Sequence, residues 1–355
     1  MGEGFAGPVL AGGKLLLFHR QNNQEILEAL DPATGKRLWA ESEPTSYRDD
    51  FGFDEGPRSA PAVDAAGRVF AYGAEGFLRA VDLATGKRLW GFNAMQRYQA
   101  PKNFFGAAGT PLVAGDRILL NIGGPSGAGI IAFDAATGRE LWRATNDGAS
   151  YSSGVLARIH GRPLALFLTR EGFVALEPET GKVAGKRRWR ARSNASVNAA
   201  SPVASGNEVF LSASYGTGAI LLEAGPEGWR ELWSGDDSLS NHYAASVLHG
   251  GFLYGFHGRQ ETGQALRCVE WKTGKVRWSL ERFGAGTVQM SDGRLAILRE
   301  NGEFLLAAPS PAGFKPQVTV KLLDGTVRAY PALQQDVVYA RNEKVLAAFR
   351  ISTKP

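Results

Sequence analysis

The chain has 355 residues, of which 44% are hydrophobic and 21% charged, and its net charge is +5. This balance is typical of a soluble globular protein, and its mildly basic character does not single out a nucleic acid as partner. The single cysteine, Cys268, excludes an internal disulfide and a cysteine-based zinc site. No apolar stretch reaches the ~18–20 residues that a membrane-spanning helix needs.

A short phrase recurs along the chain. It appears as EALDPATGKRLWAE at 28–41, as AVDLATGKRLWGF at 80–92 and as AFDAATGRELWRA at 132–144, with looser copies from Ala175, Leu221 and Cys268. A phrase that repeats at an interval of roughly 50 residues indicates a structural unit rather than a catalytic motif. The tryptophans of the six copies are Trp39, Trp90, Trp142, Trp189, Trp233 and Trp278.

A second sequence pattern precedes each copy, and it occurs eight times along the chain. It is a proline or small residue, then an apolar strand, a turn with Gly or Asp, and a second apolar strand. The units start near residues 7, 59, 109, 152, 200, 244, 285 and 329. The anchors are Pro8, Pro61, Pro111, Gly154, Pro202, Ser246, Thr287 and Pro331.

Each unit is predicted to contain four short strands, as in APAV, RVFAYG, FLRAVD and KRLWGF of the second unit. Repeated four-stranded units of this length indicate an all-β, eight-bladed β-propeller, with residues 1–355 as one propeller domain. The D-x-x-T-G-K phrase is then the turn between the third and fourth strands. Its Asp is expected to bind backbone donors, its Gly to adopt a positive φ, and the following Trp to pack on the neighbouring blade.

The phrases LDPATGKRLW, VDLATGKRLW, FDAATGRELW and VEWKTGKVRW resemble the tryptophan-docking repeat of PQQ-type propellers. That repeat occurs in quinoprotein alcohol dehydrogenases and in BamB-like outer-membrane assembly lipoproteins. The resemblance covers essentially the whole chain and implies the same eight-bladed fold. It also implies a periplasmic or cell-surface location, but the repeat specifies blades rather than a site.

Two functions remain open at this level. The first is a non-catalytic binding or scaffold propeller that presents its top face to a protein, peptide or glycan; we expect a monomer without catalytic residues, metal or nucleic-acid partner. The second is a compact quinoprotein oxidoreductase that uses PQQ and calcium. The resemblance to dehydrogenases implies long insertions and, in many, a disulfide of adjacent cysteines, which a chain with one cysteine cannot form.

Strand order predicts which residues line the top face. The loops that join one blade to the next, and the ends of the second strands, should meet there, with the TGK turns on the opposite side. We interpret the polar residues at these positions as a partly cationic funnel; the alternative is that the Arg and Glu side chains pair with each other. The predicted ligand- or partner-binding residues are Arg20, Asp54, Glu55, Arg58, Asn103, Phe105, Tyr151, Asn198, His242, Tyr243, Arg259, Arg299 and Arg328.

Two of the blade-joining loops are longer than the others, and long loops on a rigid scaffold often carry function. They are AESEPTSYRDDFGFDEGPRSA, after Trp39, and GFNAMQRYQAPKNFFGAAGT, after Trp90. We expect the loops to pack on each other, with their four phenylalanines forming a lid, and Arg58, Tyr151, His242 and Tyr243 to face the lid across a pocket. The carboxylates of the first loop also suggest a calcium site, although no known loop spacing supports it.

The last unit offers sequence for only three strands before the chain ends. We therefore expect a closing blade that has three strands, or that is completed by the N-terminal segment. The N-terminal sequence MGEGFAGPVL lacks the basic and apolar regions of a signal peptide. We expect the natural gene to encode a further strand upstream, behind a signal sequence.

Overall fold

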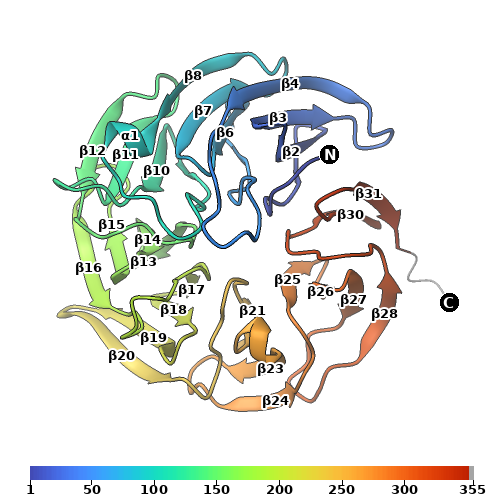
Figure 1. Cartoon of the computed structure of the whole chain (residues 1–355). Coiled ribbons are helices and arrows are strands. Elements are labelled where there is room, and N and C mark those ends of the chain that lie inside the picture. The colour runs from blue at the N-terminus through green and yellow to red at the C-terminus, as the bar shows by residue number, and fades with distance from the viewer. Residues whose placement is uncertain (352–355) are drawn as a thin grey trace. The chain divides into compact units, whose positions relative to one another are not determined.

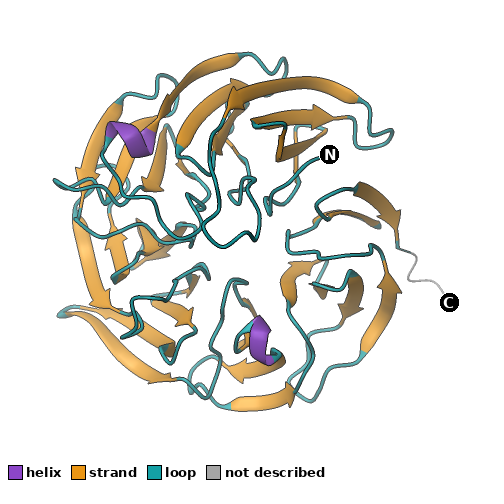
Figure 2. Cartoon of the chain, viewed as in Figure 1, coloured by secondary structure: helices purple, strands orange, loops and turns teal. Residues whose placement is uncertain are grey.

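The same four-stranded meander is built eight times along the chain. The computed structural model describes residues 1–351, which are almost entirely strands and turns with two short helical segments (Figure 2). They form an eight-bladed β-propeller in which each blade is an antiparallel sheet whose strands pair in chain order. The chain separates into two compact units. The first consists of residues 1–149, 178–181 and 329–351, and the second consists of residues 150–177 and 182–328.

The first unit holds blades 1, 2, 3 and 8 (blue to green, and red, in Figure 1). Apolar strands from adjacent blades pack face to face; Leu16 and Phe18 of blade 1, for example, share a core cluster with Val69 of blade 2. Its elements are β1 (Val9–Ala11), β2 (Lys14–Gln21), β3 (Gln24–Leu30), β4 (Arg37–Pro44), β5 (Ala62–Val63), β6 (Arg68–Tyr72), β7 (Phe77–Asp82), β8 (Arg88–Asn93), α1 (Ala94–Arg97), β9 (Leu112–Ala114), β10 (Arg117–Asn121), β11 (Ile130–Asp134), β12 (Glu140–Ala144), β29 (Ala332–Gln334), β30 (Val337–Arg341) and β31 (Leu346–Arg350).

The second unit holds blades 4 to 7. Its blades 4 and 5 pack through a cluster that includes Leu166, Phe173 and Ile220. Its elements are β13 (Val155–Ile159), β14 (Arg162–Leu168), β15 (Gly172–Leu176), β16 (Val183–Arg188), β17 (Val203–Ser205), β18 (Glu208–Ala213), β19 (Gly218–Gly225), β20 (Gly228–Gly235), β21 (Val247–His249), β22 (Phe252–His257), η1 (Gln260–Thr262), β23 (Ala265–Glu270), β24 (Val276–Leu280), β25 (Gly286–Ser291), β26 (Arg294–Arg299), β27 (Glu303–Ala307) and β28 (Pro316–Lys321).

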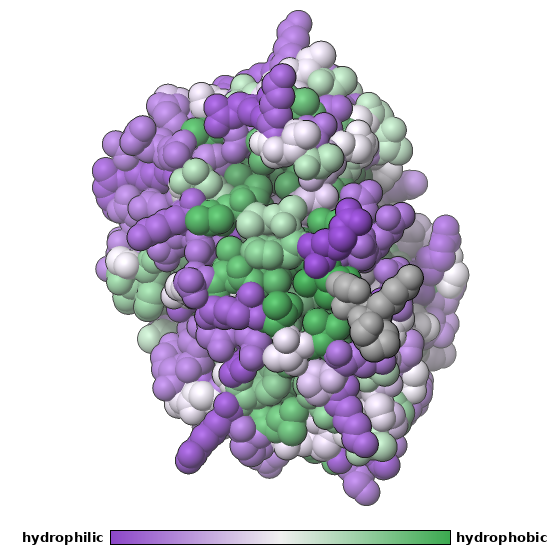
Figure 3. All heavy atoms as spheres, turned by 90° about the vertical axis from the view of Figure 1, so that its right-hand side faces the viewer, coloured by the Kyte–Doolittle hydropathy of each residue, from purple (hydrophilic) through white to green (hydrophobic). Residues whose placement is uncertain are grey.

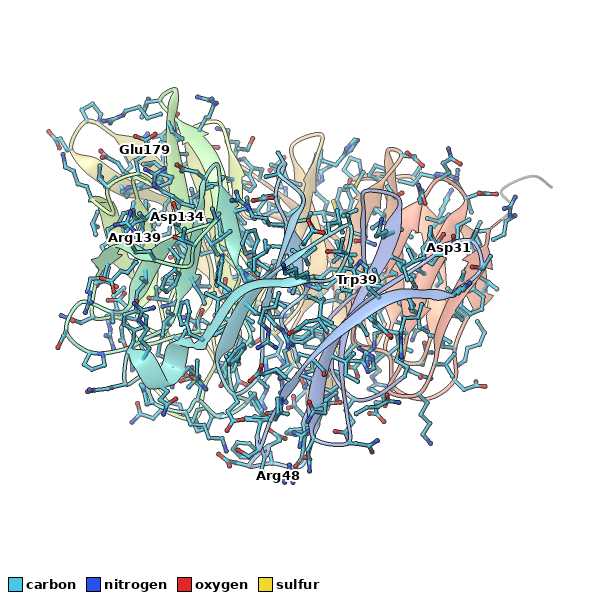
Figure 4. The ribbon with its side chains drawn as sticks, turned by 90° about the horizontal axis from the view of Figure 1, so that it is seen from above. Asp31, Trp39, Arg48, Asp134, Arg139 and Glu179 are labelled. Atoms are coloured by element: carbon cyan, nitrogen blue, oxygen red, sulfur yellow. The ribbon has the colours of Figure 1, made fainter. Side chains whose placement is uncertain are left out.

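The recurring turn has the predicted construction. In blade 1, Asp31 accepts hydrogen bonds from the backbone N–H groups of Ala33 and Thr34 at 2.9 and 2.8 Å, and Gly35 has a φ of 71°. The backbone hydrogen bond from Thr34 is the largest contribution that lowers the pKa of Asp31. Figure 4 shows Asp31 and Asp134, from two such turns, on the side of the first unit opposite Arg48 of the first long loop, as strand order predicts.

A β-bulge explains why leucine precedes the docking tryptophan. In blade 1, Ala29 pairs with Trp39 and Leu30 pairs with Arg37, so that Leu38 is skipped. The bulge turns Trp39 inward, where it is 9% exposed, and leaves Leu38 48% exposed. The indole N–H of Trp39 then donates to the carbonyl oxygen of Leu83 in blade 2 at 2.9 Å, which confirms the predicted packing on the next blade.

In blade 4 the assignment of Trp189 as the docking tryptophan of the repeat is wrong. The register places Gly185, not Trp189, at the docking position, because Ala175 pairs with Gly185 immediately before the bulge. The indole of Trp229 in blade 5 occupies the space beside Gly185, because a Cβ on Gly185 would lie 1.9 Å from the indole nitrogen. Trp189 lies beyond the end of β16 and donates to the carbonyl oxygen of Gly218 at 3.2 Å.

The eighth blade has three strands within the described residues, β29, β30 and β31, as expected. The further strand expected upstream of Met1 stays a prediction. No helix in the described part of the chain is long and apolar enough to cross a membrane.

Candidate functional site

The first long loop is tied to the end of β2 by Arg20. This side chain is 3% exposed, and its Nη1 donates to the carbonyl oxygens of Tyr47 at 2.7 Å and Glu55 at 3.0 Å. Its Nη2 lies 3.4 Å from the carboxylate of Glu55. Arg20 therefore holds the first loop against β2, and its predicted contact with a ligand stays a prediction.

Asp54 and Arg58 also hold the first loop in place. Asp54, which is 7% exposed, accepts from the backbone N–H groups of Gly4 at 3.0 Å and Gly56 at 2.7 Å, so it also supports the loop. Arg58 donates to the carbonyl oxygen of Asp54 at 2.9 Å. Its guanidinium lies 5.6 Å from the ring centre of Phe5 and 5.8 Å from that of Phe105.

The second long loop packs on the first, as expected. The ammonium group of Lys102 contacts the carboxylate of Asp50 at 2.5 Å and donates to the carbonyl oxygen of Arg48 at 2.8 Å. On the other side, Ala107 N–H donates to the carbonyl oxygen of Ala74 at 2.9 Å. The side-chain amide of Asn103 donates to the carbonyl oxygen of Ala149 at 3.5 Å.

The loops together carry an aromatic patch, defined here as Phe51, Phe53, Phe104 and Phe105. Phe51 contacts the other three, with its ring centre 5.4 Å from Phe105, 5.9 Å from Phe104 and 6.4 Å from Phe53. Phe51, Phe53 and Phe104 remain 55%, 52% and 38% exposed. Clustered exposed aromatic side chains on a supported base are typical of an interaction surface and supply no catalytic chemistry.

The four carboxylates of the first loop do not converge on one point. Asp49 accepts from Phe53 N–H at 2.6 Å, and Asp50 pairs with Lys102. Asp54 and Glu55 are engaged by Gly4 and Arg20, as described above. Within residues 1–351 no group of three or more His, Cys, Asp or Glu side chains is placed to hold a metal ion, so the calcium site considered for this loop has no ligand set among them.

The carboxylate of Glu75 in blade 2 binds the first residues of the first long loop. Glu75 accepts from the Ser46 N–H and the Thr45 hydroxyl, both at 2.9 Å, and from the Ser46 hydroxyl at 2.7 Å. Burial pushes the pKa of Glu75 upward, but the hydrogen bonds from Ser46 and Thr45 outweigh it and hold the pKa below its ordinary value of 4.5. A carboxylate with a lowered folded-state pKa stabilises the fold above the unfolded pKa and loses this effect as pH falls through the folded value.

We therefore expect the first loop to loosen in acid. Protection of the amides of residues 45–59 against hydrogen exchange, corrected for intrinsic rates, should be high at pH 6 and should fall below pH ~4. Glu75→Gln should show the lowered protection already at pH 6, with a smaller further loss in acid. Equal protection of the wild-type loop at pH 6 and pH 3 would contradict this assignment.

In the second unit, the predicted arginines are paired with carboxylates, which was the alternative interpretation. Arg328 contacts Glu300 at 2.8 Å, and the same carboxylate accepts from the Tyr243 hydroxyl at 2.8 Å. Arg259 contacts Glu261 at 3.0 Å, and Arg299 pairs with Glu303. These pairs reduce the positive charge that the three arginines offer to an anionic ligand.

Asn198 and His242 are buried parts of this unit. The amide of Asn198, which is 3% exposed, donates to the carbonyl oxygens of Thr169 at 2.8 Å and Trp189 at 3.1 Å. The backbone carbonyl oxygen of Asn198 accepts from Tyr151 N–H at 2.9 Å. Asn198 and His242 were predicted to touch a partner; the structure shows both side chains buried, and contact with a partner stays a prediction.

His242 is 8% exposed and shares hydrogen bonds with the Tyr215 hydroxyl, at 2.8 Å, and with Gln260. Burial lowers the pKa of His242, and the hydrogen bond to Gln260 opposes this change without reversing it. A lowered pKa favours the neutral form of the imidazole. Arg58 belongs to the first unit, and Tyr151, His242 and Tyr243 belong to the second, so the grouping of these four residues into one pocket stays a prediction.

A surface hollow in blades 5 and 6 was not foreseen from the sequence. It has a volume of about 450 Å³ and is lined by Glu208, Glu223, Trp271 and Lys272, among others. It lies at the turn side of these blades, away from the predicted residues, and Glu208 is already bound by the Trp271 indole at 2.5 Å and by Lys272. The available signal was Trp271 itself, which stands where the other turns carry Pro, Leu or Ala.

Eight repeated blades with tryptophan docking define this protein as a PQQ-type β-propeller. Residues 22–280 match the family described as outer membrane protein assembly factor BamB, and the chain belongs to that family. The structure is similar to BamB from Moraxella catarrhalis, with a TM-score of 0.71 and 14% identity over 98% of this chain and 96% of that one. It is also similar to the quinohemoprotein alcohol dehydrogenase of Comamonas testosteroni, with a TM-score of 0.62 and 16% identity over 96% of this chain and 70% of that one.

Among curated proteins, the chain is similar to the dehydrogenase subunits of quinone alcohol dehydrogenases. It is 31% identical to that of Komagataeibacter europaeus over 134 residues and 32% identical to that of Acetobacter aceti over 145 residues. These matches cover 36% and 39% of this chain and span only 18% and 19% of the relatives' own length.

Proposed function

We propose that this protein is a non-catalytic binding scaffold that contacts a protein partner through the aromatic patch on its two long loops. The observation that carries the proposal is the exposure of Phe51, Phe53 and Phe104 on a base held by Arg20 and Arg58. A rigid aromatic surface gives contact area at low cost in conformational entropy, which suits a protein surface better than a glycan or a free peptide. Membership of the BamB family supports this scaffold role and a periplasmic or cell-surface location.

The alternative, a PQQ- and calcium-dependent oxidoreductase, is weakened by the donor groups. Calcium prefers several convergent oxygen ligands, whereas the loop carboxylates have separate partners and the second-unit arginines are paired. The carboxylates of the first loop therefore do not support the alternative. Adding PQQ with calcium should give neither a bound-quinone absorption band nor alcohol-dependent dye reduction, and either result would overturn the scaffold assignment.

The patch itself is tested by site-specific photo-crosslinking in cells. A benzoyl-phenylalanine placed at position 51, 53 or 104 should capture one and the same protein. The matched control is position 89, because Leu89 is also an apolar side chain, 45% exposed, but lies on an outer strand. Capture of the same protein from position 89, or of none from the three patch positions, would contradict the proposal.

Alanine variants then measure the contribution of the aromatic side chains. The triple variant Phe51→Ala, Phe53→Ala and Phe104→Ala should bind the captured partner at least ~10-fold more weakly, because exposed aromatic anchors carry a large share of interface energy. The double variant Leu38→Ala and Leu89→Ala removes apolar side chains of similar exposure from the outer strands and should bind as the wild type does. Equal loss in both variants would assign the effect to general surface hydrophobicity.

A further inference from the structure

The surface hollow of blades 5 and 6 (yellow to orange in Figure 1) has a charged lining that departs from the repeat. It lies within the second unit, and its volume of about 450 Å³ is large enough for a small organic molecule. Blade 5 contributes Glu208 and Glu223 to the lining, and blade 6 contributes Leu248, Trp271 and Lys272. The two glutamates decide which kind of molecule the hollow can hold.

Glu208 and Glu223 stand where other blades place opposite charges. In blade 2, Arg68 at the start of the second strand is directly opposite Asp82 at the end of the third strand, and blade 3 has the same arrangement. In blade 5 the same pair of positions holds Glu208 and Glu223. Like charges directly opposite each other in a sheet repel, so blade 5 carries an excess of negative charge at this point.

Glu223 also lacks the role that its counterparts have in the recurring turn. Asp82, for example, accepts from the backbone N–H of Thr85 at 2.8 Å. In blade 5, β19 and β20 extend beyond this position, so Glu223 lies inside a strand pair and opposite Arg230. Within residues 1–351 its carboxylate is engaged by Arg230 through Oε2, at 2.7 Å from Nε. The other oxygen, Oε1, is therefore available to a ligand.

An ammonium group already contacts Glu208, and it shows which chemical group this carboxylate accepts. The side chain of Glu208 is 8% exposed; its Oε2 accepts from the indole N–H of Trp271 at 2.5 Å, and its Oε1 contacts the ammonium group of Lys272. The buried indole fixes the carboxylate, whereas the side chains of Lys272 and Arg230 are 69% and 70% exposed. Ion pairs with such exposed partners contribute little to stability, so an incoming cation can displace them.

We propose that the hollow binds a small organic cation, whose primary ammonium group lies between the carboxylates of Glu208 and Glu223. The ammonium group makes charge-assisted hydrogen bonds to both carboxylates, and the alkyl chain that carries it lies against Leu248. The two carboxylates select the charge of the ligand, which the apolar surface near the end of the described chain in Figure 3 does not do. This site is separate from the aromatic patch and does not depend on the function proposed for it.

The probe is 1,4-diaminobutane, titrated into the 355-residue protein by calorimetry at pH 7 and low ionic strength. It should bind saturably, and 1,4-butanediol should bind at least ~10-fold more weakly, because its hydroxyl groups carry no charge. The peptide acetyl-Gly-Lys-Gly-amide presents the same ammonium group on a protein chain. Tighter binding of the diamine would identify a free amine as the source of the cation, and tighter binding of the peptide would identify a lysine side chain of another protein.

Two matched pairs of variants place the diamine in the hollow. Glu223→Gln should weaken its binding at least ~10-fold, because it removes one of the two charges that hold the ammonium group. Glu227→Gln removes the same charge from an exposed residue of the following turn and should not. Lys272→Ala should strengthen binding ~2–5-fold, because the ligand no longer has to displace an ammonium group from Glu208. Lys275→Ala removes the same charge from an exposed position three residues further on and should have little effect.

Four results would overturn the proposal. One is the absence of saturable diamine binding at millimolar concentration. Another is equal weakening by Glu223→Gln and Glu227→Gln, which would mean that only the net charge of the protein attracts the amine. The third is weaker binding to Lys272→Ala than to the wild type, because the ammonium group would then not take the place of Lys272. The fourth is saturable binding of calcium that excludes the diamine, which would assign the two carboxylates to a metal ion.

Discussion

Replacing Glu41 by alanine should lower the free energy of unfolding by about 3–5 kcal/mol, because it leaves a buried guanidinium without its carboxylate. Arg79 on β7 is completely buried, and its Nη1 lies 2.9 Å from Glu41. Its Nη2 also donates to the carbonyl oxygen of Glu25 at 3.1 Å, and the guanidinium lies 5.0 Å from the ring centre of Phe18. The carboxylate of Glu25 interacts with Arg79 as well, but less strongly than that of Glu41. Burial lowers the pKa of Arg79, and the negative charge of Glu41 opposes that change.

Urea unfolding followed by circular dichroism measures the effect. Glu43→Ala is the matched control, since Glu43 lies two residues along the same strand and contacts Arg88 at 2.7 Å with a partly exposed side chain. Such a pair contributes about 0–1 kcal/mol. The double variant Arg79→Met with Glu41→Leu should recover much of the loss, because an apolar pair of similar volume leaves no buried charge. A loss from Glu41→Ala no greater than that from Glu43→Ala would show that Arg79 finds other compensation.

The blades could be predicted because their signals are local. A proline or small residue lies directly before the first strand in blades 1, 2 and 3, at Pro8, Pro61 and Pro111, and the turn chemistry of Asp31 and Gly35 is contained in five residues. The wrong assignment of Trp189 as a docking tryptophan also comes from a local signal. The docking position is set by its distance from the TGK glycine, and Gly185, not Trp189, stands at that distance.

The candidate site could be predicted only in part, because burial and pairing depend on residues that are distant in sequence. The two loops could be recognised because they are longer than the other blade-joining loops, and their phenylalanines could be read directly from the sequence. That Arg20 is a tether depends on Tyr47 and Glu55, which follow it by 27 and 35 residues. An arginine at a strand end has the same appearance in the sequence whether it faces solvent or a loop carbonyl.

Gly86→Ala should destabilise the protein by about 2–5 kcal/mol, the sum of ~1–2 kcal/mol of backbone strain and ~1–3 kcal/mol of overpacking. Gly86 has a φ of 73°, and a Cβ built on it would lie 2.5 Å from the ring of Trp39. Gly35→Ala is the internal control, since the same turn position has a φ of 71° but meets no atom within 4 Å. It should lose only the strain, about 1–2 kcal/mol.

The difference between the two variants isolates the contact of a docked tryptophan with its turn. Trp39→Ala combined with Gly86→Ala should cost less than the sum of the two single changes, because the methyl group then enters the space that the indole has left. Chemical unfolding of the four variants completes this cycle. Equal losses at Gly86 and Gly35 would mean that the tryptophan yields freely, and that blade-to-blade docking rests on the strands and on the indole hydrogen bond to Leu83 rather than on ring packing.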